Sequence, residues 1–109
     1  MNSAEMLRDL GHMVIEAGSA EDAMAALEST DIDVLVADLG LPGMSGAELA
    51  LQAQSMRQDI GVVFATGRSS LGDEEKAIPR TVLLRKPYDI EGLRRAIAGV
   101  AAKFRAENP

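Results

Sequence analysis

Short runs of consecutive apolar residues recur along the chain, and they constrain its fold more than any other feature. They predict four strands, at residues 13–15, 33–38, 60–65 and 81–84. Within each run the apolar residues are continuous instead of alternating with polar ones, as expected for strands buried on both faces. Such strands belong to parallel sheets whose two faces are covered by helices, so the runs already favour an α/β protein.

Segments with helical periodicity separate the predicted strands. Ser19 and Ser45 each stand three residues before an acidic residue, which is the spacing of a helix N-cap. Residues 67–80 are weakly patterned and predict at most one or two helical turns. The longer predicted helices cover residues 2–10, 19–27, 45–56 and 89–104. Four strands alternating with four to five helices predict a parallel sheet joined by right-handed crossovers.

Length and composition exclude several classes of protein. The chain has 109 residues, which predicts a single domain over 1–109, and no cysteine, which excludes a disulfide framework. With 11 basic and 17 acidic residues the net charge is −6, which argues against direct binding of nucleic acid. No apolar run is long enough to cross a membrane, and the first residues lack the pattern of a secretory signal. We therefore expect a cytoplasmic domain.

Polar residues with chemical potential stand at the ends of three predicted strands. They are Asp38, Thr66 and Lys86. Because functional residues of open α/β sheets gather at the carboxyl ends of the strands, we expect these three side chains to form one site. A carboxylate can attack phosphorus and form an aspartyl phosphate, and that reaction requires positive charge around the phosphoryl oxygens. Lys86 can supply an ammonium group there, and Thr66 a hydroxyl donor.

Two motifs resemble those of a known family. The segment D-L-G-L-P-G-M-S-G at residues 38–46 is similar to the phosphoacceptor loop of response-regulator receiver domains in two-component signalling. The segment L-L-R-K-P at residues 83–87 is similar to the lysine-proline pair after the last strand of that family. The spacings along the chain also match those of the family, with Thr66 28 residues after Asp38 and Lys86 20 residues after Thr66. The resemblance covers nearly the whole chain and implies a flavodoxin-like, three-layer sandwich.

The resemblance also implies roles for particular residues. Asp38 would accept the phosphoryl group, Thr66 would sense it and Lys86 would bridge to it. Asp38 and the backbone carbonyl of Gly40 would contact Mg²⁺, and Pro87 would follow a cis peptide bond. The expected partner is a histidine kinase or a phosphotransfer protein.

The sequence departs from the family pattern at its beginning. The family starts with an apolar strand that ends in two acidic residues, and no such strand or pair is visible here. We therefore expect an N-terminally short receiver domain in which Mg²⁺ binds weakly or not at all. The missing strand is central in the family, so the strand at residues 33–38 should have an open edge, through which a homodimer can form.

A second departure concerns signal transmission. The family carries an aromatic residue three positions before the lysine, whereas this chain has Leu83. With F-A-T-G at residues 64–67, the chain resembles an atypical receiver subgroup that lacks the aromatic switch. An order–disorder change of residues 67–80 is a hypothesis for what replaces it.

Three functions remain open from the sequence. The leading hypothesis is a phosphoacceptor that signals by conformational change and is not itself an enzyme with a diffusible substrate. The second is a phosphorylation-independent receiver-like module that binds proteins, which the missing acidic pair favours. The third is a small flavodoxin-like enzyme domain, which lacks a supporting cluster of carboxylates or histidines.

Overall fold

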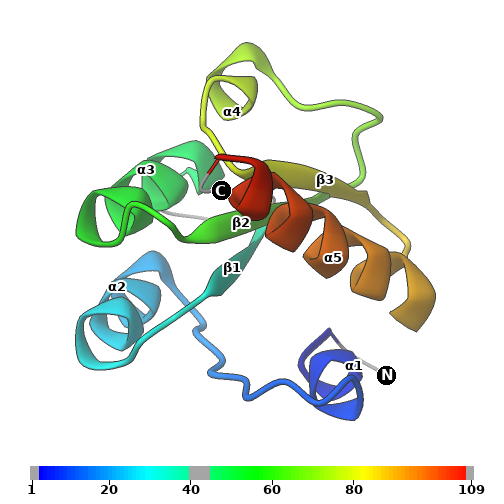
Figure 1. Cartoon of the computed structure of the whole chain (residues 1–109), viewed down its shortest axis with the longest axis horizontal. Helices are drawn as coiled ribbons and strands as arrows, with labels where there is room; N and C mark the ends of the chain where they lie inside the picture. The colour runs from blue at the N-terminus through cyan, green and yellow to red at the C-terminus, as the bar shows by residue number, and fades with distance from the viewer. Residues whose placement is uncertain (1–2, 40–44, 108–109) are drawn as a thin grey trace.

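A parallel three-stranded sheet forms the centre of the computed structural model, which describes residues 3–39 and 45–107. In that part of the chain the strands lie side by side in the order β1-β2-β3 (Figure 1). They are β1 (Val34–Asp38), β2 (Gly61–Thr66) and β3 (Thr81–Arg85). These bounds confirm three of the four predicted strands and the parallel sheet.

Within the described ranges, five helices connect and cover the strands. Ser19 and Ser45 cap the second and third helices, since each hydroxyl accepts a hydrogen bond from the backbone N–H three residues later, at 3.1 Å. The weakly patterned segment forms a single helical turn, as predicted. The helices are α1 (Ser3–Asp9), α2 (Ala20–Ser29), α3 (Gly46–Met56), α4 (Asp73–Lys76) and α5 (Ile90–Glu107).

The helices make two layers, one on each face of the sheet. Helix α3 packs on one face, flanked by α2, and α5 packs on the other, flanked by α1 (Figure 1). The alternation of strand side chains fixes this arrangement. Val62 and Phe64 join the core under α3, whereas Val63 joins the core under α5, and all three are fully buried. The three-layer sandwich predicted from the sequence is therefore present.

Helix α5 lies especially close to the start of β2. A methyl group added at Gly61 would come within 1.8 Å of Val100 Cγ1, so only glycine fits there without displacing the helix. Because Val100 is buried in the core under α5, the contact fixes the height of that helix above the sheet.

The fourth predicted strand, at residues 13–15, does not form, and that prediction is wrong. Residues 12–17 carry no regular secondary structure. Met13 is fully exposed, and Ile15 is exposed by about half, at 51%. A strand is stable when a neighbour satisfies its backbone groups, and among the described residues no strand lies beside this segment. The sheet thus has three strands instead of four.

Among the described strands, β1 has a neighbour on one side only, and this is the open edge predicted for residues 33–38. Asp33 accepts a hydrogen bond from Gly61, and Leu39 donates one to Ala65, both at 3.0 Å. Odd-numbered residues of this segment therefore face β2. In a parallel strand the alternate residues face the opposite side, so Val34 and Val36 direct their backbone groups away from β2. A groove of about 700 Å³ runs along this edge, bordered by α1, α2 and residues 11–17.

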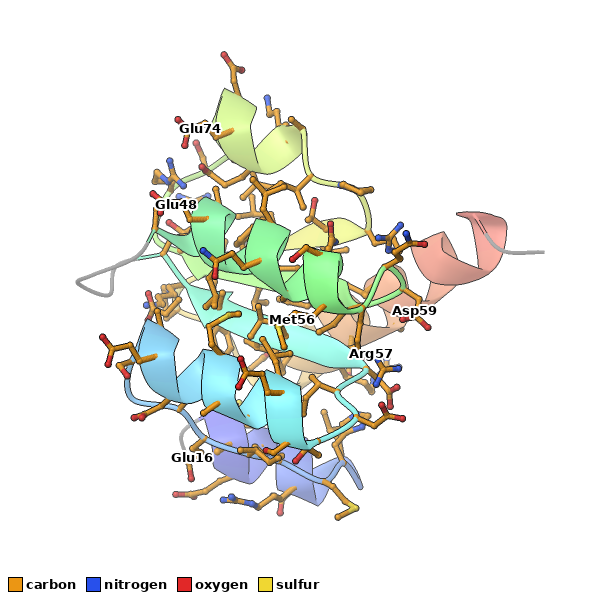
Figure 2. The ribbon with its side chains drawn as sticks, turned by 90° about the vertical axis from the view of Figure 1, so that its left-hand side faces the viewer. Glu16, Glu48, Met56, Arg57, Asp59 and Glu74 are labelled. Carbon is orange, nitrogen blue, oxygen red and sulfur yellow. The ribbon has the colours of Figure 1, made fainter. Side chains whose placement is uncertain are left out.

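Acidic side chains are spread over the surface. Figure 2 shows Glu16 between α1 and α2, Glu48 on α3 and Glu74 on α4, and all three are exposed. The acidic surplus is therefore largely solvated on the described elements. None of the described helices combines the length and the apolar character that crossing a bilayer requires.

Candidate functional site

The parallel register brings the three predicted site residues to one end of the sheet. Asp38 is the last residue of β1, and Thr66 is the last residue of β2. Lys86 follows β3, and its backbone N–H donates to the carbonyl of Thr66 at 2.8 Å. All three line one cavity of about 340 Å³ at the carboxyl ends of the strands. The structure thus brings the three predicted residues together, and their roles stay predictions.

An ion pair joins two of these residues. The Lys86 ammonium donates a hydrogen bond to Oδ2 of Asp38. Both side chains are partly exposed, by 40% and 37%, so the carboxylate is reachable from solvent. The Lys86–Pro87 peptide bond is cis, as the resemblance implied. The pair places a cation beside a nucleophilic oxygen, which is the arrangement that phosphoryl transfer to a carboxylate requires.

Thr66 is buried, with 6% of its surface exposed, and its hydroxyl oxygen faces the loop after β2. Oγ1 accepts hydrogen bonds from the backbone N–H of Arg68 at 3.2 Å and from Arg68 Nε at 3.4 Å. Since both contacts use the oxygen as acceptor, the hydroxyl keeps its own proton as a donor. Thr66 can therefore donate to an anionic oxygen in the cavity while Arg68 holds it in place.

Arg68 and Glu75 belong to the site although no sequence motif singled them out. Both line the cavity, and Arg68 Nη2 lies 2.6 Å from Glu75 Oε1. The same carboxylate oxygen accepts the backbone N–H of Gly72 at 2.9 Å. These two donors, the Gly72 amide first and Arg68 second, hold the pKa of Glu75 below its ordinary value. Only the position of Arg68, two residues past a strand end, could have indicated its place.

The described residues offer Mg²⁺ a poor set of ligands. Asp38 offers one carboxylate as a ligand, and that carboxylate already accepts a hydrogen bond from the Lys86 ammonium. Within residues 3–39 and 45–107, no three histidine, cysteine, aspartate or glutamate side chains gather as a metal-binding group. Gly40, whose carbonyl was the second expected ligand, lies outside the described residues. Mg²⁺ favours roughly six oxygens in a tight octahedron, so this donor set does not fit a strong magnesium site.

Comparison with known proteins decides the family. The family model described as the response regulator receiver domain matches residues 1–98. This chain belongs to the response regulator receiver family. The match spans all three strands of the sheet and each of the three predicted site residues, so the phosphoacceptor resemblance of residues 38–46 and the shared fold point to the same family.

Curated relatives carry the receiver domain within longer proteins. Transcriptional regulatory protein QseB of Haemophilus influenzae is 34% identical over 102 residues, which are 92% of this receiver domain and 43% of that protein. Transcriptional regulatory protein PdtaR of Mycobacterium tuberculosis is 30% identical over 107 residues, or 96% of this chain and 52% of that protein. The chain thus spans about half or less of the length of these relatives.

Solved structures agree with the three-layer fold. Chemotaxis protein CheY4 of Vibrio cholerae superposes with a TM-score of 0.81 at 27% identity, covering 89% of this receiver domain and 84% of that chain. A CheY-like receiver domain from Methanospirillum hungatei superposes with a TM-score of 0.80 at 24% identity, covering 96% and 86%. The flavodoxin-like fold predicted from the sequence is confirmed.

Proposed function

We propose that this receiver domain accepts a phosphoryl group on Asp38 from a histidine kinase or a phosphotransfer protein in the cytoplasm. The observation that carries the proposal is the ion pair between Asp38 and Lys86 in a solvent-reachable cavity, with Thr66 beside it. A carboxylate, an ammonium and a hydroxyl at one strand-end cavity supply a nucleophile, a counter-charge and a hydrogen-bond donor for a phosphoryl group.

The proposed phosphoryl transfer is a displacement reaction at the phosphorus atom. A carboxylate oxygen of Asp38 forms a bond to the phosphorus atom of a phosphohistidine on the partner. The phosphorus–nitrogen bond breaks, and its electron pair leaves with the imidazole, which takes up a proton. Lys86 then faces the new phosphoryl oxygens and offsets their charge, and the Thr66 hydroxyl donates to one of them.

The product acts as a signal and not as the intermediate of an enzyme with a diffusible substrate. An acyl phosphate at Asp38 adds negative charge next to Thr66, at the end of β2, and Lys86, directly after β3. The conformation that contacts this group best gains population. Leu83 is half-buried on β3 and provides no aromatic switch, so the loop of residues 67–72 and α4 is the proposed responding element.

The test is phosphorylation by a small phosphodonor such as acetyl phosphate, followed by intact-mass measurement with and without Mg²⁺. We expect a mass gain of one phosphoryl group in the unmodified chain and none in Asp38→Asn. Asp33→Asn is the matched control, because Asp33 is an exposed carboxylate at the other end of the same strand segment. Equal gain in Asp38→Asn, or no gain in the unmodified chain under either condition, refutes the proposal.

Two observations favour a second function, a receiver-like module that binds proteins without phosphorylation. The described residues gather no three carboxylate or histidine side chains as a metal-binding group, and the described strands leave β1 with an open edge beside a groove. Such a module would bind its partner equally well as the unmodified chain and as Asp38→Asn. A partner affinity that depends on Asp38 and on the phosphodonor excludes it.

The open edge of β1 also supports self-association. Val34 and Val36 direct backbone donors and acceptors away from β2, and the exposed Met13 and Ile15 border the same groove. We propose that a second copy of the chain pairs with this edge. Sedimentation equilibrium should show a dimer that Val36→Pro dissociates, because proline removes an edge donor. Leu51→Ser is the control, because Leu51 is an exposed apolar residue on α3, away from this edge. Val82→Pro is unsuitable, because it would remove a hydrogen bond between β3 and β2.

A further inference from the structure

A second cation lies in the phosphoacceptor cavity. Arg68 lines it together with Lys86, and each of the two cations is paired with one carboxylate of the same cavity. Lys86 pairs with Asp38, the nucleophile, whereas Arg68 pairs with Glu75 on α4. The Arg68–Glu75 pair has no part in the proposed attack on phosphorus, so its position in the cavity needs a separate explanation.

The two partners of this pair differ in how freely they can move. The Glu75 side chain is only 12% exposed and is anchored by the Gly72 backbone N–H at 2.9 Å. The Arg68 side chain is 52% exposed, so its guanidinium can turn within the cavity without disturbing the core. Thr66 holds the base of Arg68 through the backbone N–H contact at 3.2 Å. Arg68 is therefore held by Thr66 at its backbone N–H and, through the longer 3.4 Å contact, at Nε, while the exposed outer part of its guanidinium can turn.

The charged side chains that line the cavity predict how it would respond to a phosphoryl group on Asp38. Two cations and two carboxylates balance within the cavity, and a phosphoryl group on Asp38 would add negative charge that Lys86 alone does not balance. A guanidinium presents five N–H donors in a planar fork that matches phosphate oxygens in pairs. Arg68 is the residue with that geometry among those that line the cavity, and Asp38 lines the same cavity.

We propose that Arg68 is a second anion-binding residue of this site and that Glu75 is a latch that competes with the anion for it. The proposal rests on the proposed function, because the anion in question is the phosphoryl group of Asp38. When the guanidinium turns to the phosphoryl oxygens, Glu75 loses its counter-ion, and the tie between the loop after β2 and α4 is released. The lowered pKa of Glu75 agrees with a latch that stays charged and closed near neutral pH.

The test uses inorganic phosphate as the probe and Asp38→Asn as the parent protein. This variant removes the negative charge that repels free phosphate and cannot form an acyl phosphate, so binding is measured apart from phosphotransfer. We expect Arg68→Ala in this parent to weaken phosphate binding roughly tenfold or more, the loss of one charge-assisted hydrogen bond. Arg68→Lys should restore part of the affinity, because it keeps the charge but not the fork.

Removing the latch should act in the opposite direction. Glu75→Gln keeps an oxygen that can accept the Gly72 N–H but loses the charge that holds Arg68, so we expect phosphate to bind several-fold more tightly, roughly the worth of a partly exposed ion pair. Arg94→Ala is the matched control, because Arg94 forms an ion pair with Glu91 on α5 and does not line the cavity. It should leave the dissociation constant unchanged.

A spectroscopic measurement separates direct contact from a general structural effect. In nitrogen-detected NMR spectra the Arg68 Nε–H signal should shift as phosphate is added, whereas the Arg94 signal should stay in place. Absent phosphate binding, or equal affinity in the Arg68→Ala, Glu75→Gln and parent proteins, overturns the proposal. If the unmodified chain is not phosphorylated but phosphate binding depends on Arg68, the proposed function fails and the anion site stands. If Asp38 is phosphorylated but Arg68 does not affect phosphate binding, the proposed function stands and the anion site fails.

Discussion

Two apolar segments of similar composition have opposite fates in this molecule. Met13-Val14-Ile15 and Val62-Val63-Phe64 are both short, continuous and apolar. The second is the fully buried centre of β2, with β1 on one side and β3 on the other. The first forms no strand, and Met13 is fully exposed. Apolar composition therefore makes a segment able to form a strand, and a neighbouring strand decides whether it does.

The largest expected contrast comes from truncating one side chain in each segment. Phe64→Ala should lower the free energy of unfolding by about 3–5 kcal/mol, because it opens a cavity in a closed core. Met13→Ala should change it by less than about 0.5 kcal/mol, because Met13 contacts mainly solvent. Urea denaturation measures both. A large loss in Met13→Ala would show that residues 12–17 are packed in solution, and would break the comparison.

Two glycines extend the contrast to the backbone. Gly61→Ala should cost about 1–3 kcal/mol, because the added methyl group meets Val100 of α5. Gly18→Ala, next to the unpaired segment, should be close to neutral, since no atom lies within 4 Å of the added group. The midpoints of urea denaturation measure both costs. Equal effects of the two changes would contradict the close approach of α5 to β2.

Buried polar contacts also distinguish the sheet and α3 from the segment of residues 12–17. Gln54 on α3 donates to the backbone carbonyls of Pro79, at 2.7 Å, and Ile60, at 3.3 Å, which lie just before β3 and β2. Gln54→Leu should cost about 1–2 kcal/mol, because both carbonyls lose a donor. Gln52→Leu on the exposed side of the same helix is the control and should stay within about 0.5 kcal/mol. Equal costs in the two variants would show that these contacts do not form.

The smallest expected effect is a change with pH in the free energy of unfolding, and it compares Glu75 on α4 with Glu16 in the segment of residues 12–17. The Gly72 N–H and Arg68 lower the pKa of Glu75 from 4.5 in the folded chain, so its contribution to stability is complete above that value and is lost as pH falls through the lowered pKa. The difference in unfolding free energy between the unmodified chain and Glu75→Gln should therefore shrink on acidification to about pH 3.

Glu16 provides the control for that measurement. It pairs with Arg8 at 3.5 Å next to the unpaired segment, and the two side chains are exposed by 64% and 50%. Exposed pairs of this kind add little to stability, so Glu16→Gln should give a small difference at either pH. A pH-independent difference for Glu75→Gln would show that its contacts are as weak as those of Glu16.

The sequence predicts most of the sheet but not all of its interactions. The strands around Val36, Val63 and Leu84 could be located because each is apolar on both faces and lies between helices. The strand at residues 13–15 was predicted wrongly, because its own residues do not report whether a neighbouring strand exists. Tertiary contacts were also invisible, such as Gly61 under α5, since they depend on how elements pack.

The candidate site shows the same division. Asp38, Thr66 and Lys86 could be predicted, because each stands at the end of an apolar strand and such ends meet at one edge of a parallel sheet. Arg68 and Glu75 could not, because their pairing depends on how the loop after β2 folds back on α4. Residues on regular elements are thus placed by periodicity, and residues on loops by contacts that only the structure reveals.

Localisation of the phosphoryl group tests the central claim most directly. The chain is incubated with acetyl phosphate, any acyl phosphate is trapped by borohydride reduction before digestion, and the peptides are sequenced by tandem mass spectrometry, with Asp38→Asn treated in parallel. The account predicts one modified position, Asp38, and its loss in the variant. A phosphoryl group on another residue, such as Asp33 or His12, or an unmodified Asp38 in the digested chain, would contradict it.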